Sequence, residues 1–159
     1  MVENPFKKKP FINCLVYVFG YFYKMNILGK LIIIGGAVDK GSFTETDLDK
    51  TAAKNLNFFE TGILKRIIDE SKYKEQSRIE VVTTASKIPK EIGPEYVKAL
   101  SYLGAKNIDV LDIEKREQAS EPLILERLKS ADVLIFTGGD QLRITSILGG
   151  TPFDEVLLD

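Results

Sequence analysis

The chain has 159 residues, of which 44% are hydrophobic and 28% charged, a balance that indicates one soluble globular domain and excludes a disordered or fibrous chain. Its formal net charge of −1 argues against a general affinity for nucleic acid or anionic membranes. The chain contains no His and a single Cys, Cys14. It therefore cannot by itself build a Ser–His or Cys–His pair, a His-ligated or multi-Cys metal site, or an intrachain disulfide. The lone Cys fits a reducing, cytoplasmic compartment.

Residues 1–24 differ in composition from the rest of the chain. They hold seven of the fifteen aromatic side chains, and four Lys against one Glu give them a charge of +3. A basic start followed by the apolar run 10–23 imitates a secretory signal, but no small-x-small cleavage site follows, and the run is shorter than the roughly 20 residues that span a bilayer. We interpret 1–24 as an extension ahead of a natural start at Met25, with 25–159 as the domain. A membrane-associating leader is the alternative.

From residue 30 onward, apolar runs typical of buried strands alternate with segments typical of helices. We expect Gly104 to end one helix, and Ser120 to cap the next, whose first turn holds Pro122. In chain order, the pattern predicts a strand at 31–34 that is buried on both faces, helices at 56–68 and 94–103 with a strand at 79–84 between them, a strand at 108–111, the helix after Ser120, a strand at 133–136, and short helices at 141–148 and from about 153.

This alternation predicts an α/β fold, a parallel sheet flanked by helices on both faces. Ligands of such sheets bind at the carboxyl ends of the strands, so the loops at 35–41, 84–87 and 137–143 are the candidate binding segments. The first loop does not match a nucleotide motif. A dinucleotide fingerprint starting at Gly35 needs glycines where the chain has Ala37 and Lys40, and a P-loop over 36–41 needs Lys and then Ser or Thr where the chain has Ser42 and Phe43.

The loop that follows the last predicted strand carries the most chemical information. Gly138 and Gly139 leave backbone amides unobstructed by side chains, and such amides can donate to a developing oxyanion. Asp140, Gln141 and Arg143 add an acceptor, an amide and a fixed cation, and the planar fork of an Arg binds both oxygens of a carboxylate. The alternative is an ordinary turn in which Asp140 caps the helix at 141–148 and Arg143 is solvated.

Several segments together carry a resemblance to a known family: KLIIIGGAVDK at 30–40, TAS at 84–86 with Pro89, Glu91, Gly93 and Tyr96, LGA at 103–105, FTGGDQLR at 136–143, Thr145 with Ser146, and LGGT at 148–151. With these segments, from about Lys30 to its last residues, the chain resembles the amino-terminal half of the cyanophycinase family. The resemblance implies a class I glutamine amidotransferase-like, flavodoxin-like α/β fold that is incomplete at its C-terminal side. It also implies a serine exopeptidase that hydrolyses cyanophycin, an arginine-bearing poly-aspartate, to β-aspartyl-arginine dipeptides.

By this resemblance, Gly138 and Gly139 form the oxyanion hole, and Asp140, Gln141 and Arg143 contact the substrate. Gln141 would touch the departing dipeptide, and Arg143 a substrate carboxylate. The family implies no cofactor, no metal and no nucleic acid partner; its substrate is an acidic arginine-bearing polymer or β-aspartyl dipeptide, and the complete protein is expected to form a homodimer.

The family's nucleophilic Ser and its His have no counterpart in the chain. None of its serines lies in a Gly-x-Ser-x-Gly elbow. We therefore expect a fragment cut short before its catalytic machinery and inactive alone. A non-catalytic binding module and a nucleotide-binding domain are the alternatives.

Overall fold

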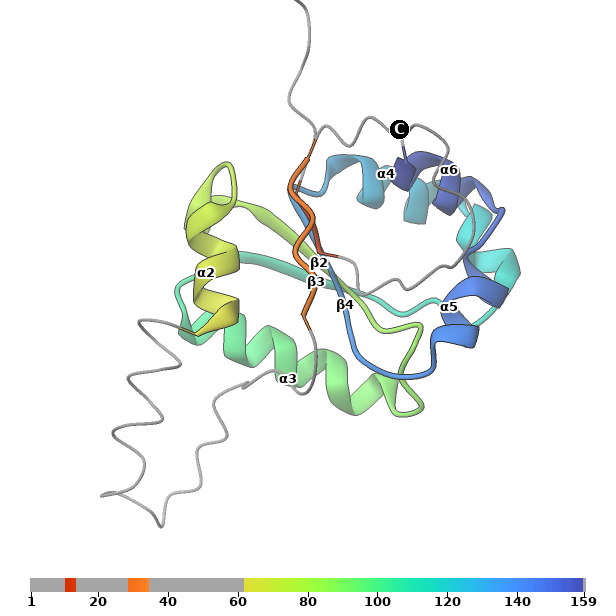
Figure 1. Cartoon of the computed structure of the whole chain (residues 1–159), viewed down its shortest axis with the longest axis horizontal. Helices are drawn as coiled ribbons and strands as arrows, with labels where there is room; N and C mark the ends of the chain where they lie inside the picture. The colour runs from red at the N-terminus through yellow and green to blue at the C-terminus, as the bar shows by residue number, and fades with distance from the viewer. Residues whose placement is uncertain (1–10, 14–28, 35–61, 159) are drawn as a thin grey trace, which may run out of the picture.

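Four parallel strands make up the sheet in the computed structural model, which describes residues 11–13, 29–34 and 62–158 (Figure 1). These strands are β1 (Phe11–Asn13), β2 (Arg78–Val82), β3 (Asn107–Leu111) and β4 (Val133–Phe136), and their order across the sheet is β1-β4-β2-β3. Val82 pairs with both Leu111 and Phe136. The carboxyl ends of β2, β3 and β4 therefore meet at one edge, where the predicted loops at 84–87 and 137–143 begin.

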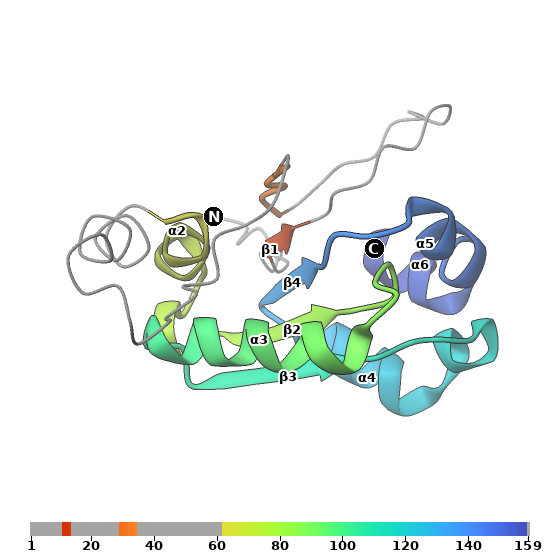
Figure 2. The same ribbon diagram turned by 90° about the horizontal axis from the view of Figure 1, so that it is seen from below.

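Alternate side chains of the central strands enter two separate apolar clusters. Ile79, Val81, Val133 and Ile135 pack with α2 (Ile63–Glu70) and α3 (Pro89–Tyr102). The intervening residues pack on the opposite face against α4 (Pro122–Ser130), the 3-10 turn η3 (Arg116–Ser120), α5 (Gln141–Ile147) and α6 (Pro152–Leu158). The views in Figures 1 and 2 show helices on both faces of the sheet, which confirms the predicted α/β fold class.

A buried ion pair fixes α4 to the sheet. Glu80 lies on β2 and is 0% exposed, and Arg127 of α4 binds both of its carboxylate oxygens, with Nη2–Oε2 and Nε–Oε1 distances of 2.6 and 3.2 Å. Arg127 also donates to the carbonyl of Val110 on β3, at 3.1 Å. The charge of Glu80 is thus compensated, and one guanidinium links two neighbouring strands to a helix.

The helix ends follow local sequence rules in some places and depart from them in others. Gly104 has φ +95°, and its amide and that of Ala105 bond to the carbonyls of Ser101 and Leu100, which confirms the predicted stop. The predicted cap at Ser120 is wrong. Ser120 ends η3, and Glu121 is the N-cap residue, without a side-chain bond. Pro122 does lie in the first turn, as expected.

The boundaries of three predicted elements differ from those in the structure. The helix predicted at 94–103 begins at Pro89, which takes the first-turn place, and Pro94 lies inside it. The strand predicted at 79–84 ends at Val82, because the amide of Ser86 turns back to bond the carbonyl of Thr83 at 2.8 Å. The helix predicted at 56–68 is seen from Ile63 to Glu70, and 56–61 lie outside the described residues.

The predicted strand at 31–34 is wrong in this structure. Leu31 and Ile33 are 44% and 67% exposed, while Ile32 and Ile34 pack against the cluster on the α2–α3 face. The edge of β4 is paired instead with Phe11–Asn13, within the segment interpreted as an extension. One strand edge accepts one partner, so the apolar run at 31–34 is left half exposed. Cys14 and the loop at 35–41 lie outside the described residues.

No helix in the described part of the chain is both long and apolar enough to cross a membrane.

Candidate functional site

The turn that follows β4 packs tightly against the turn that follows β2. Gly139 has φ +153°, and a β-carbon built on it would lie 2.1 Å from the carbonyl oxygen of Ala85. The amide of Asp140 donates to the same oxygen at 2.9 Å, and the amide of Thr137 donates to Val82 at 3.0 Å. Position 139 therefore requires glycine for space as well as for backbone conformation.

The amides of Gly138 and Gly139 remain available to a ligand. Both residues are exposed, and nothing lies within 4 Å of the place where a β-carbon on Gly138 would be. Within the described ranges, no backbone or side-chain oxygen accepts a hydrogen bond from either amide. Such amides can stabilise an oxyanion that comes from outside the described residues.

Asp140 carries out the local role that the sequence left open. Its Oδ1 accepts a hydrogen bond from the amide of Leu142 at 2.9 Å, which makes Asp140 the N-cap of α5. Gln141, next to it, is exposed, and no described residue bonds its side-chain amide. Gln141 is thus free to contact a ligand, whereas one carboxylate oxygen of Asp140 is already used.

Arg143 is anchored rather than solvated. Its Nε donates to the carbonyl of Thr84 at 3.0 Å, and the side chain is half-buried between the two turns. No carboxylate in the described part of the chain pairs with its terminal nitrogens. A guanidinium that is held by Nε and open at its outer edge can bind a carboxylate through both terminal nitrogens.

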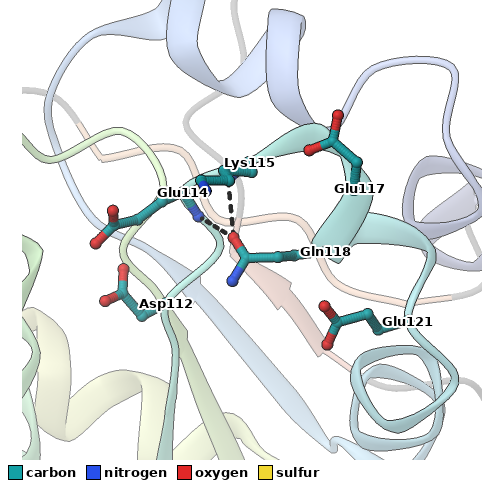
Figure 3. A pocket seen from close by; sticks show the side chains of 6 residues that line it. All are labelled: Asp112, Glu114, Lys115, Glu117, Gln118 and Glu121. Carbon is teal, nitrogen blue, oxygen red and sulfur yellow. Dashed lines mark hydrogen bonds between the residues drawn. The ribbon is translucent and has the colours of Figure 1, made fainter.

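A polar hollow of about 610 Å³ begins at Asp112, directly after β3, and was not predicted from the sequence. Gln118 Oε1 accepts hydrogen bonds from the backbone amides of Glu114 and Lys115, at 2.9 and 2.8 Å, and so closes this segment into a tight turn (Figure 3). Asp112, which also lines the hollow, accepts a hydrogen bond from the hydroxyl of Thr83 at 3.1 Å. Within the described residues, no group of His, Cys, Asp or Glu is arranged to hold a metal ion. The hollow is lined by Asp112, Glu114, Lys115, Glu117, Gln118 and Glu121.

Two buried hydroxyls at the same edge of the sheet were not singled out from the sequence. The Oγ1 atoms of Thr84 and Thr137 are buried without a hydrogen-bond partner. Only the three-dimensional arrangement distinguishes these two from Thr83, whose hydroxyl is bonded to Asp112.

Comparison with known proteins extends this picture. No model of a known protein family matches the chain. The cyanophycinase of Trichormus variabilis is 34% identical over 79 residues, which cover 50% of this chain and 26% of the relative. The cyanophycinase of Geminocystis herdmanii is 38% identical over 77 residues, which cover 48% and 28%. This chain is cyanophycinase-like over about half of its length.

The remaining comparisons set the extent of that likeness. The cyanophycinase of Synechococcus elongatus is 32% identical over 74 residues, 46% of this chain and 23% of the relative. The chain thus spans about a quarter of the length of the cyanophycinases it matches. A crystal structure of a peptidase from an acI-B1 actinobacterium superposes with a TM-score of 0.52 at 24% identity, over 59% of this chain and 41% of that one, and supports the same α/β fold.

Proposed function

We propose that this chain provides one wall of a cyanophycinase-type hydrolytic site. Its substrate would be cyanophycin, cleaved to β-aspartyl-arginine dipeptides by a serine exopeptidase mechanism, or another β-aspartyl peptide cleaved in the same way. The observation that carries the proposal is the exposed Gly138–Gly139 turn, whose free amides lie beside the anchored Arg143. The identity of the chain to several cyanophycinases supports the choice of substrate.

In this proposal, each residue at the edge of the sheet has a distinct task. The amides of Gly138 and Gly139 donate to the carbonyl oxygen as it becomes an oxyanion on the newly tetrahedral carbon, a contribution that is worth about 10²–10³ in rate in known hydrolases. Arg143 holds a substrate carboxylate, and Gln141 contacts the departing dipeptide. Asp140 shapes the turn through its bond to Leu142 and presents its second carboxylate oxygen to the rim.

The proposed site needs groups that this chain does not contain. With no His, the chain has no imidazole base to activate a serine hydroxyl, so the nucleophile and the base must come from another stretch of polypeptide. We propose that the 159-residue chain is inactive alone. A cytoplasmic location and a homodimeric complete protein belong to the same proposal.

A chimera tests the proposal directly. The segment of this chain that aligns with the Geminocystis herdmanii cyanophycinase replaces its counterpart there, and release of β-aspartyl-arginine from cyanophycin is followed by chromatography. We expect the chimera to hydrolyse cyanophycin and the 159-residue chain to release nothing. Hydrolysis by the chain alone would refute its inactivity, and a folded chimera without activity would refute the assignment of the wall.

A further inference from the structure

The side-chain hydroxyls of Thr84 and Thr137, at the carboxyl edge of the sheet, make no hydrogen bonds. Each residue is 2% exposed, and each Oγ1 is buried without a partner. In the described part of the chain, these are the two buried side-chain polar atoms that lack a hydrogen bond. Buried hydroxyls are normally bonded because burial without a partner costs free energy, so both atoms call for an explanation.

Neighbouring hydroxyls on the same turns are satisfied. Thr83, one residue before Thr84, donates to Asp112 Oδ1 at 3.1 Å, and Ser86 Oγ accepts the amide of Ile88 at 3.1 Å. Poor local packing would leave these groups unpaired as well. On these turns, hydrogen bonds are therefore missing only at the two threonines that flank the candidate site.

Both threonines belong to the framework that holds that site. Thr137 directly precedes Gly138, and the carbonyl of Thr84 accepts the Nε of Arg143 at 3.0 Å. Three kinds of donor without a described acceptor thus occur along one edge: two hydroxyls, two glycine amides and the outer guanidinium nitrogens. Such donors together suit a ligand with several acceptor oxygens, and a carboxylate offers two charged ones that match the outer nitrogens of a guanidinium.

We infer that the hydroxyls of Thr84 and Thr137 are ligand-binding groups, which donate hydrogen bonds to a carboxylate-bearing peptide held at this edge by Arg143. The inference rests on the proposed function and adds two specificity-determining residues to it. Because both oxygens are covered in the unbound chain, the side chains that cover them must shift as the ligand enters, while the two turns stay joined. The contacts that join them are the bond from Asp140 to Ala85 and the bond from Arg143 to Thr84.

Threonine-to-valine variants separate this role from a structural one. Valine has nearly the shape of threonine without the hydroxyl. If the hydroxyls are unpartnered in the free chain, Thr84→Val and Thr137→Val each raise the melting temperature of the 159-residue chain, by about 2–4 °C. The matched control Thr83→Val lowers it, because the bond to Asp112 is lost.

The same variants are titrated calorimetrically with β-aspartyl-arginine dipeptide and with the dipeptide amidated at both carboxylates. We expect Thr84→Val and Thr137→Val to weaken binding of the free dipeptide about 5- to 10-fold each, and to leave the weaker binding of the amidated form unchanged. Higher stability together with weaker binding is a combination that a purely structural role does not produce.

Three outcomes would overturn the inference. The first is a fall in melting temperature for both variants, since it would mean that the hydroxyls have partners in the free chain. The second is unchanged dipeptide affinity, and the third is no binding by the unaltered chain. An active chimera with either of the last two results leaves the proposed function standing and removes the two threonines from it. An inactive, folded chimera refutes the function itself.

Discussion

The backbone of Gly139 approaches the carbonyl of Ala85 so closely that a β-carbon on residue 139 would lie 2.1 Å from that oxygen. This contact sets the distance between the turns that follow β2 and β4. The geometry of the candidate site therefore depends on residue 139 being glycine as much as on the side chains around it.

Gly139→Ala should destabilise the chain, while Gly138→Ala should not. Alanine at 139 meets backbone and also has to adopt φ +153°, and strained backbone of this kind costs about 1–3 kcal/mol before any steric clash is added. At 138 there is nothing within 4 Å of the added carbon. Urea unfolding of both variants measures the difference, and equal unfolding free energies would show that the turns are not in contact in solution.

Arg143→Lys should weaken the binding of β-aspartyl-arginine at least tenfold, with little change in stability. Lysine keeps the positive charge but loses both the Nε anchor on Thr84 and the planar fork that binds two oxygens. Arg116→Lys is a suitable control, because Arg116 bonds the carbonyls of Ser146 and Gly150 rather than the candidate site. If both variants bind the dipeptide equally well, Arg143 does not contact the carboxylate.

The ion pair between Glu80 and Arg127 should show strong coupling in a double-mutant cycle. Arg127→Met leaves the buried carboxylate with only Arg78 nearby, at 3.5 Å, and loss of one partner of a buried pair typically costs about 3–5 kcal/mol. In the double variant Glu80→Leu with Arg127→Met, most of that loss should be recovered, because no buried charge remains. Thermal or urea unfolding of the four chains gives the coupling energy, and additive losses would contradict the pairing.

Titration of Glu70 tests the placement of residue 30 beside α2. The hydrogen bond from Lys30 and the charges of Lys30 and Arg66 lower the pKa of the Glu70 carboxyl below its ordinary value. Because the folded state has the lower pKa, this pair stabilises the fold above the unfolded pKa, and the contribution is lost as the pH falls through the folded pKa.

The Lys30→Met variant should raise the pKa of Glu70 toward its ordinary value, measured by NMR titration of the carboxyl carbon. Arg66→Met, the matched control on the same helix, should raise it less, since Lys30 is the larger cause. High salt should reduce both effects, as the groups are exposed. An unchanged pKa in Lys30→Met would place residue 30 elsewhere.

The features of the fold that depend on neighbouring residues alone were predicted correctly from the sequence. Residues 133–136 are apolar throughout and become a strand that is buried on both faces, and the helix stop at Gly104 needs only a positive φ. The sequence did not reveal which of two apolar segments would pair with the edge of β4. An apolar run at 31–34 has the pattern of a buried strand, and nothing in its own residues shows that Phe11–Asn13 pairs with β4 instead.

At the candidate site, too, some features were predictable from the sequence and others were not. Two glycines after a buried strand indicate a turn with free amides, and the turn was predicted from the sequence, while its role as a binding site stays a prediction. The task of Asp140 could not be predicted, because a carboxylate serves equally well as a helix cap and as a ligand group, and only the bond to Leu142 distinguishes the two. The unbonded hydroxyls of Thr84 and Thr137 could not be predicted either, because which polar atoms are buried depends on the whole fold.

The three-residue pairing of β1 with β4 also determines the order in which the sheet comes apart. This pairing joins the strands that lie farthest apart in the sequence, so the entropic cost of closing the intervening chain is the greatest in the sheet. It also has the fewest paired residues, so the fewest hydrogen bonds offset that cost. Amide protons of β1 should exchange with deuterium well before those of β2, and the exposed flank of β4 would then be ready to receive another strand.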